Sequence, residues 1–251
     1  MGFSAKFGVM TMARSPLTLL LVTKRLSIRT LSFVSSGLNP ALITALQSAN
    51  IHTPTWIQQS VIPHILDRKN VAFADQTGSG KTIAYMLPLL NNVKSLEGSS
   101  GLLATPGYPR AVVLAPSREL AVQIGDVAKM FCHHIKLTAR LIVGGKSISQ
   151  QKQIFDDSVD VVIATPGRLR ELISNGFCRL NNTKTVVFDE ADTLFDGKSG
   201  FMDEIQNGIL KRLPKSADIQ FVLVPEFKNY NVQSASQDSS KAQGQLHRRW
   251  R

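Results

Sequence analysis

Cysteine is scarce in this sequence, since 251 residues contain only Cys132 and Cys178. The two lie far apart and match no spacing typical of a zinc site or a disulfide framework. They predict reduced thiols in an intracellular compartment, with no disulfides. A long apolar run is also lacking, because the longest candidate, residues 17–22, falls far short of the roughly 18 apolar residues that predict a membrane span. No membrane insertion is therefore expected.

Acidic residues are absent from the first 66 positions, which contain five Lys and Arg residues. Residues 226–251 add five basic and two acidic residues, so most of the net charge of +11 lies near the two ends. A basic surface suits polyanions such as RNA. Because these terminal segments need not be folded, the charge alone leaves nucleic-acid binding open.

The basic N-terminal segment, residues 1–32, is rich in Ser and Thr and predicts an organelle transit peptide rather than a secretory signal. A mitochondrial location is predicted, with a plastid, or the nucleus or nucleolus, as alternatives. A plain disordered basic terminus is the other interpretation. Residues 225–251 are rich in Gln, Ser and Lys without aliphatic periodicity, which predicts a disordered tail.

The intervening residues, 33–224, predict one folded domain. Two short helices are expected between residues 38 and 66, with a break at Thr53-Pro54. Six β-rich runs then alternate with helix-length segments, at residues 71–75, 111–115, 139–143, 160–164, 185–189 and 219–224. Such apolar runs are typical of parallel strands covered on both faces, so we expect a doubly wound α/β domain.

Residues 74–82 read Ala-Asp-Gln-Thr-Gly-Ser-Gly-Lys-Thr between a predicted strand and a predicted helix, which indicates a phosphate-binding loop. Glycines let the backbone N–H groups turn toward phosphate, and the helix N-terminus adds partial positive charge. Lys81 is expected to reach the β- and γ-phosphates, and the Thr82 hydroxyl to bind Mg²⁺. The expected nucleotide contacts in this loop are Thr77, Gly78, Ser79, Gly80, Lys81 and Thr82.

Residues 186–192 read Val-Val-Phe-Asp-Glu-Ala-Asp, an apolar strand that ends in carboxylates. We expect Asp189 to hold Mg²⁺ beside the phosphate-binding loop, and Glu190 to orient and deprotonate the attacking water. A kinase has no need of this second carboxylate, because water is not its nucleophile. The pair therefore favours ATP hydrolysis, with Lys81, Asp189 and Glu190 as catalytic residues at the ends of adjacent strands.

Together these motifs resemble those of the DEAD-box RNA helicases, a family named after the sequence Asp-Glu-Ala-Asp, which stands here at residues 189–192. The resemblance extends from Phe33 to about residue 224 and implies a RecA-like P-loop domain that binds ATP, Mg²⁺ and RNA. Residues 54–58 resemble the family's Q motif, which implies that Gln58 reads the adenine edge with Phe33 as the upstream aromatic. Ile51 stands where the residue that stacks on adenine is expected.

Three further motifs resemble the segments that line the family's RNA groove and contact the sugar–phosphate backbone. Arginine charge and the N–H groups of a helix start suit phosphate contacts, so binding independent of RNA sequence is expected. The partners expected besides RNA are ribonucleoprotein or ribosome-assembly factors, and the sequence does not distinguish between them. The implied RNA contacts are Pro116, Arg118, Gly144, Gly145, Thr165, Pro166, Gly167 and Arg168.

Two departures from the family pattern affect the nucleotide site. Asp75 replaces the usual small residue at the start of the loop, and its carboxylate would repel phosphate if it pointed inward. Ile51 is aliphatic where an aromatic residue is usual. Because base stacking on an aromatic contributes about 1–3 kcal/mol, we expect weaker ATP selectivity.

A third departure follows the last predicted strand, where residues 225–227 read Pro-Glu-Phe in place of the family's Ser-Ala-Thr. A second RecA-like domain is also not recognisable in the sequence. Since the arginine finger of that domain is worth about 10³–10⁵-fold in rate, we expect the chain alone to hydrolyse ATP slowly and not to unwind duplexes. The alternative is a non-catalytic RNA- or ribonucleoprotein-binding module, or a truncated helicase product.

Overall fold

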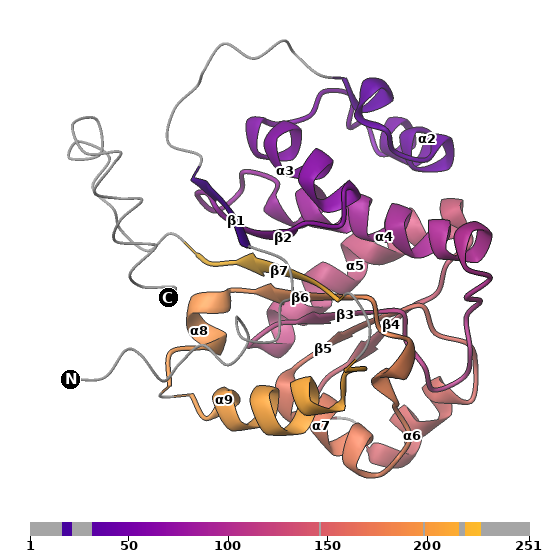
Figure 1. Cartoon of the computed structure of the whole chain (residues 1–251), viewed down its shortest axis with the longest axis vertical. Coiled ribbons are helices and arrows are strands. Elements are labelled where there is room, and N and C mark those ends of the chain that lie inside the picture. Colours follow the sequence, from indigo (N-terminus) through magenta and orange to yellow (C-terminus); the bar gives the residue numbers. More distant parts are fainter. Residues whose placement is uncertain (1–16, 22–31, 146, 198, 216–218, 227–251) are drawn as a thin grey trace.

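The computed structural model describes residues 17–21, 32–145, 147–197, 199–215 and 219–226. A parallel sheet of seven strands has helices on both faces (Figure 1). The strand order is β1-β2-β7-β6-β3-β5-β4. The strands are β1 (Leu17–Leu21), β2 (Asn70–Ala74), β3 (Ala111–Leu114), β4 (Ala139–Ile142), β5 (Val161–Ala164), β6 (Thr185–Asp189) and β7 (Gln220–Val224). The predicted doubly wound α/β fold and its six expected strands are confirmed.

One face of the sheet packs against four helices and a short 3-10 turn. Side chains at alternate strand positions, such as Val113 and Val187, are fully buried in the core on this side. Each buried aliphatic side chain contributes about 1.5–3 kcal/mol, so this layer is a main source of stability. The elements are η1 (Phe33–Ser36), α2 (Pro40–Ser48), α3 (Trp56–Leu66), α4 (Lys81–Ser99) and α5 (Arg118–Ile135).

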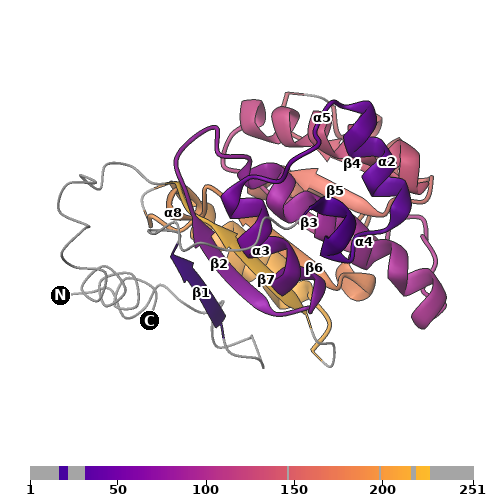
Figure 2. The same cartoon turned by 90° about the horizontal axis from the view of Figure 1, so that it is seen from above.

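The opposite face packs against shorter helices, and Figure 2 shows the sheet between the two layers. The intervening strand positions, including Val112 and Phe188, are buried in a second core with residues of this layer. The alternation along β3 therefore divides its side chains between two cores. The elements are α6 (Ile148–Lys152), η2 (Gln153–Phe155), α7 (Pro166–Ser174), η3 (Leu180–Asn182), α8 (Ala191–Leu194), α9 (Phe201–Asp203), the π-helical η4 (Glu204–Ile209) and η5 (Leu210–Arg212).

The two helices predicted between residues 38 and 66 are confirmed, and each has a side-chain cap at its start. The Asn39 side chain accepts a hydrogen bond from Ala41 N at 2.9 Å, with Pro40 as the first helical residue of α2. Thr55 and Gln58 form a capping box at the start of α3. These caps define where α3 begins, and therefore place Gln58 in its first turn.

The sequence does not predict strand β1, which pairs with β2 from Leu17↔Asn70 to Leu21↔Ala74. Its run of Leu and Thr gives no alternation, and it lies in a segment interpreted as a basic terminus. The domain boundary predicted at residue 33 therefore leaves out a strand of the sheet. The rest of residues 1–31, and residues 227–251 of the predicted tail, lie outside the described residues, so the transit-peptide and disorder predictions stay predictions.

Strand β7 lies between β2 and β6, and this corrects the expectation that the phosphate-binding loop and Asp189 end adjacent strands. The register pairs Val222 with both Val71 and Val187. The last strand of the described residues thus enters the middle of the sheet. Because all strands are parallel, their carboxyl ends still meet at one edge, and the phosphate-binding loop and the carboxylates share that edge.

Cys132 and Cys178 are both buried, and they are not bonded to one another. Burial raises the pKa of each thiol to about 12, and the charge of Asp160 adds to the effect at Cys132. Across the described ranges, helices long and apolar enough to cross a bilayer do not occur.

Candidate nucleotide-binding site

The loop after β2 turns through two glycines in the left-handed region, Gly78 at φ 82° and Gly80 at φ 88°. Such φ values are strained for any residue with a side chain. At Gly80 space is also lacking, because a Cβ atom would lie 2.5 Å from Gln58 Nε2. Gly80 directly precedes helix α4, so the sequence forms the glycine turn and helix start of a phosphate-binding loop as predicted.

Lys81 lies folded against its own loop. Its Nζ atom donates to the carbonyl oxygens of Asp75 at 2.7 Å and Gln76 at 2.8 Å. The Asp75 carboxylate is turned to the backbone, where Oδ1 accepts from Gln76 N at 2.8 Å. An ammonium has three N–H donors, so Lys81 keeps one for phosphate, and a second bond to phosphate requires it to release one of these carbonyl oxygens.

Gln58 joins helix α3 to the phosphate-binding loop. Its Oε1 atom accepts from Thr55 N at 2.9 Å, and its Nε2 atom donates to Gly80 O at 3.2 Å. The side chain is only 2% exposed. Both polar ends of Gln58 therefore bond to backbone in this structure, which leaves one Nε2 hydrogen and one Oε1 lone pair for a further partner such as adenine.

A cavity of about 160 Å³ opens beside Gln58. Phe33, Pro54 and Gln58 line it, whereas Ile51 does not and instead packs against the core. Whole ligands usually occupy about 300–1,000 Å³, so a cavity of this size suits part of a nucleotide, such as the base. Phe33 and Gln58 thus lie together at one cavity, as the resemblance implies, and Ile51 does not line that cavity.

Asp189 ends strand β6 and is 6% exposed. Its Oδ2 atom accepts from the Tyr85 hydroxyl at 2.8 Å, and its Oδ1 atom accepts from Glu190 N at 3.0 Å. Burial raises the pKa of Asp189, against the opposing effects of these two hydrogen bonds and of the Lys81 charge. Because Tyr85 lies one helical turn after Lys81 on α4, this bond joins the phosphate-binding loop to the carboxylate strand.

Tyr85 is not distinguished by the sequence, where it stands among several apolar residues of helix α4. It is fully buried, and burial followed by the Asp189 charge raises its pKa well above the ordinary value. The only available signal was its position four residues after Lys81, on the same side of the helix.

Replacing Tyr85 with phenylalanine is expected to lower the free energy of unfolding by about 1.5–3 kcal/mol, because Asp189 would lose a hydrogen bond to a charged group in a buried place. Urea denaturation measures the change. Tyr108→Phe is the matched control, since that hydroxyl bonds the exposed Arg179 at 2.7 Å and should contribute less than about 1 kcal/mol. Equal effects of the two substitutions would contradict this role of Tyr85.

Glu190 adopts φ 46°, in the left-handed region, directly before helix α8. A non-glycine residue in this region costs about 1–2 kcal/mol, and such strain is common at functional sites. The turn sets Glu190 immediately beyond the buried Asp189. The structure therefore places one carboxylate inside the sheet edge and a half-buried one at its tip, as the sequence predicts.

The last carboxylate of the motif, Asp192, has a partner that the sequence did not suggest. Its Oδ1 atom accepts from the backbone N of Glu226 at 2.9 Å. Glu226 follows Pro225 immediately after β7. In the family, the resemblance implies that hydroxyls of the Ser-Ala-Thr motif contact this carboxylate. In this chain, which lacks that motif, the backbone amide of Glu226 bonds it instead.

The predicted RNA contacts lie at the same carboxyl edge of the sheet, after β3, β4 and β5. Arg118 Nη1 donates to Gly144 O at 3.5 Å, and a Cβ atom on Gly145 would lie 2.5 Å from the same nitrogen. The Pro116–Arg118 segment and the paired glycines are thus neighbours, and the left-handed φ of 86° is what favours glycine at position 145.

The third predicted RNA motif forms the start of helix α7, with Thr165 as N-cap and Pro166 in its first turn. Two carboxylates lie close to it. Arg168 pairs with Glu171 at 2.9 Å, and a Cβ atom on Gly167 would lie 2.9 Å from Glu204 Oε1. Arg168 therefore has a charged partner within its own helix, and its contact with RNA phosphate stays a prediction.

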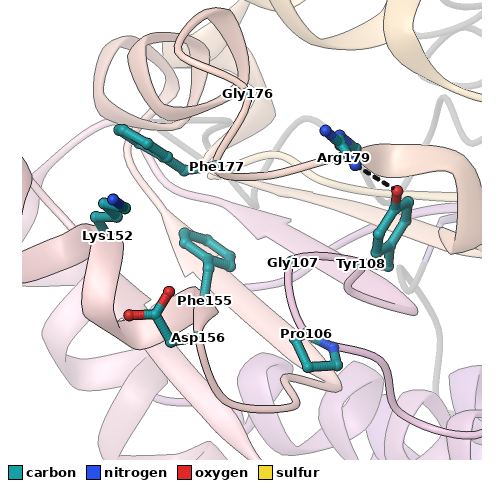
Figure 3. A pocket seen from close by; sticks show the side chains of 9 residues that line it. All are labelled: Pro106, Gly107, Tyr108, Lys152, Phe155, Asp156, Gly176, Phe177 and Arg179. Atoms are coloured by element: carbon teal, nitrogen blue, oxygen red, sulfur yellow. Dashed lines mark hydrogen bonds between the residues drawn. The ribbon is translucent and has the colours of Figure 1, made fainter.

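A second cavity, of about 200 Å³, lies among the loops that precede β3, β5 and β6, at the opposite edge of the sheet (Figure 3). Lys152 Nζ lies 5.3 Å from the centre of the Phe177 ring. The Arg179 guanidinium lies 5.6 Å from the centre of the Tyr108 ring. None of the predicted site residues lines this cavity, so it is separate from the candidate nucleotide site.

Comparison with known proteins agrees with this geometry. The protein-family model described as "DEAD/DEAH box helicase" matches residues 55–225. The chain is 40% identical over 175 residues to DEAD-box ATP-dependent RNA helicase 39 of Arabidopsis thaliana, covering 70% of the chain and 28% of that protein. It is 32% identical over 209 residues to the ATP-dependent RNA helicase RhlB of Shewanella frigidimarina, covering 83% of the chain and 47% of that protein. The chain spans less than half the length of these relatives.

Proposed function

Because this chain belongs to the DEAD/DEAH box helicase family, we propose that it binds ATP and the RNA backbone as the ATP-binding part of an ATP-dependent RNA helicase. The bond between Tyr85 and Asp189 supports this most directly. It holds the helix that begins with Lys81 against the strand that ends in the buried carboxylate. Triphosphate binding requires this proximity of a cation and a carboxylate at one sheet edge.

Mg²⁺ fits the donor set proposed for it. Asp189 is a buried carboxylate that accepts hydrogen bonds from a tyrosine hydroxyl and a backbone N–H group and feels the charge of Lys81, and a cation would offset the cost of its burial. Thr82, at the start of α4, would supply the second oxygen. Proteins usually hold Mg²⁺ with one or two carboxylates and the substrate phosphates. When bound, the ion neutralises part of the phosphate charge.

The chain's own residues divide the remaining work. Lys81 would release one of its loop carbonyl oxygens and donate to the β- and γ-phosphates. Glu190, at the strained turn, would orient the attacking water and accept its proton. Phe33 and Gln58 would bind the base in the neighbouring cavity, and Arg118 with the glycines at 144–145 would contact RNA phosphates.

A second candidate function is a non-catalytic RNA- or ribonucleoprotein-binding module. It is favoured by residues 225–227, which replace the Ser-Ala-Thr motif, and by Lys81, whose ammonium binds loop carbonyls. RNA binding without Lys81-dependent nucleotide binding would favour this module. A mitochondrial location remains a proposal that rests on the composition of residues 1–32 alone.

The test of the main proposal is a titration of the purified chain with Mg²⁺ and a fluorescent ATP analogue. Lys81→Met should weaken binding at least about tenfold, because charge-assisted bonds to phosphate are lost. Lys129→Met is the matched control, since that lysine lies on α5 and is 66% exposed. Equal affinity of the wild-type and Lys81→Met chains would refute nucleotide binding at this loop. In parallel, binding to single-stranded RNAs of different sequence should weaken with salt and show little sequence preference.

A further inference from the structure

Residues 225 and 226 extend β7 alongside the phosphate-binding loop. The β2–β7 register pairs Val71 with Val222 and Ala72 with Leu223, and the isolated bridge between Asp75 and Glu226 continues that register. Asp75 is the first residue of the loop that follows β2. The backbone at Glu226 therefore runs beside the place where the loop leaves the sheet.

Glu226 is held there from both sides. Its backbone N–H donates to Asp192 Oδ1 at 2.9 Å, and its side-chain Oε1 accepts from the Thr77 hydroxyl at 3.4 Å. The first contact fixes the residue to the carboxylate motif after β6, and the second directs its carboxylate onto the phosphate-binding loop. Glu226 is half-buried, so water screens its charge less than that of a fully exposed side chain.

The Glu226 carboxylate contacts the segment of the loop at residues 75–77, which also holds the Lys81 ammonium. Lys81, the residue that reaches β- and γ-phosphates in such loops, has its ammonium on the carbonyls of Asp75 and Gln76. Glu226 is paired with the first of these residues and bonded to Thr77, which follows the second. A γ-phosphate bound by Lys81 would therefore meet the negative charge of Glu226.

We infer that Glu226 is a specificity-determining residue that weakens binding of nucleoside triphosphate relative to diphosphate. The inference rests on the proposed nucleotide function. It adds a physical reason for the chain to prefer nucleoside diphosphate over triphosphate. Repulsion between like charges grows with the charge of the ligand and falls with distance, so the γ-phosphate is affected more than the α- and β-phosphates. The Glu226→Gln substitution keeps the shape of the side chain and the bond from its backbone N–H to Asp192, and removes the negative charge.

The experiment is isothermal titration of the full 251-residue chain with ADP and with the non-hydrolysable β,γ-imido analogue of ATP, both with Mg²⁺. Glu226→Gln should raise the affinity for the triphosphate analogue roughly tenfold, and that for ADP about threefold or less. The difference should shrink as salt rises from about 0.1 M to about 1 M. Asp126→Asn is the control, because it removes one carboxylate that is 68% exposed on α5.

An unchanged ratio of the two affinities in Glu226→Gln, with binding that still depends on Lys81, would overturn this inference and leave the proposed function intact. A similar change in the ratio for Asp126→Asn would also overturn it, because the effect would then come from net charge. Absence of binding in every variant would overturn both. Equal melting temperatures of wild type and Glu226→Gln would show that the comparison concerns folded protein.

Discussion

Replacing Glu190 with glutamine is expected to slow ATP hydrolysis by about 10²–10⁴-fold, the usual contribution of a positioned general base. Glutamine has nearly the same shape as glutamate but cannot accept a proton at neutral pH. Glu190 lies just beyond Asp189, in a left-handed turn at φ 46° that directs the chain away from the buried strand. Since the proposed phosphate contacts belong to Lys81 and the proposed metal contact to Asp189, nucleotide affinity should be largely unchanged.

Phosphate release measured with and without RNA tests this expectation, together with the nucleotide titration used for Lys81. Asp126→Asn should keep the wild-type rate, because that carboxylate is exposed on α5 and far along the chain from the motif. Wild-type turnover in Glu190→Gln would exclude Glu190 as the base. Loss of nucleotide affinity equal to the loss of rate would instead assign Glu190 to binding.

The second large effect concerns stability and comes from Arg110, a fully buried cation. Its guanidinium bonds the Asp160 carboxylate through Nε at 3.0 Å and also through Nη2. It donates further to Glu97 Oε1 at 3.0 Å and to the carbonyl oxygen of Leu102 at 2.8 Å. Asp160 in turn accepts from Thr138 N at 2.7 Å, so this network joins the starts of β3, β4 and β5.

Arg110→Met is expected to lower the free energy of unfolding by about 3–5 kcal/mol, because it leaves the Asp160 charge buried without its cation. Urea denaturation measures the change. Arg140→Met is the matched control, because Arg140 pairs with Asp157 at 3.9 Å and the two side chains are 40% and 77% exposed. The loss of unfolding free energy in this control should be below about 1 kcal/mol. Adding Asp160→Asn to Arg110→Met should restore part of the stability, and a further loss would contradict the explanation.

The same network predicts a pH dependence. Burial by itself would raise the pKa of Glu97, but hydrogen bonds from Lys94 and Arg110 hold that pKa below its usual value. A carboxyl group with a depressed pKa adds stability that is complete above its unfolded pKa and is lost as pH falls through the folded value. The acid side of the wild-type stability curve should therefore be steeper than that of Arg110→Met.

Sequence patterns predicted the local elements well because their causes are local. The apolar runs at residues 111–115 and 185–189 are strands, and the Thr55–Gln58 capping box begins a helix, for reasons contained within a few residues. The phosphate-binding loop likewise depends on glycines and a lysine within one short segment. Strand β1 was missed because its Leu and Thr residues give no pattern that distinguishes an added edge strand from a basic leader.

The site could be predicted in composition but not in arrangement. Phe33 and Gln58 do line one cavity, yet Ile51 does not. Arg168 pairs with a glutamate one turn later, a partner that its motif does not indicate. Such partners depend on rotamers and on neighbouring elements, which a motif does not specify.

The sequence by itself determined the family, the parallel α/β class and the chemical groups of the site, because each follows from residue type and short spacing. Only the tertiary structure decided that β7 lies between β2 and β6, that Tyr85 bonds Asp189, and that Glu226 faces the phosphate-binding loop. These contacts join residues 104 and 149 positions apart in the chain. The lateral order and register of parallel strands fix such contacts, and because both arise from packing across the whole sheet, no local pattern specifies them.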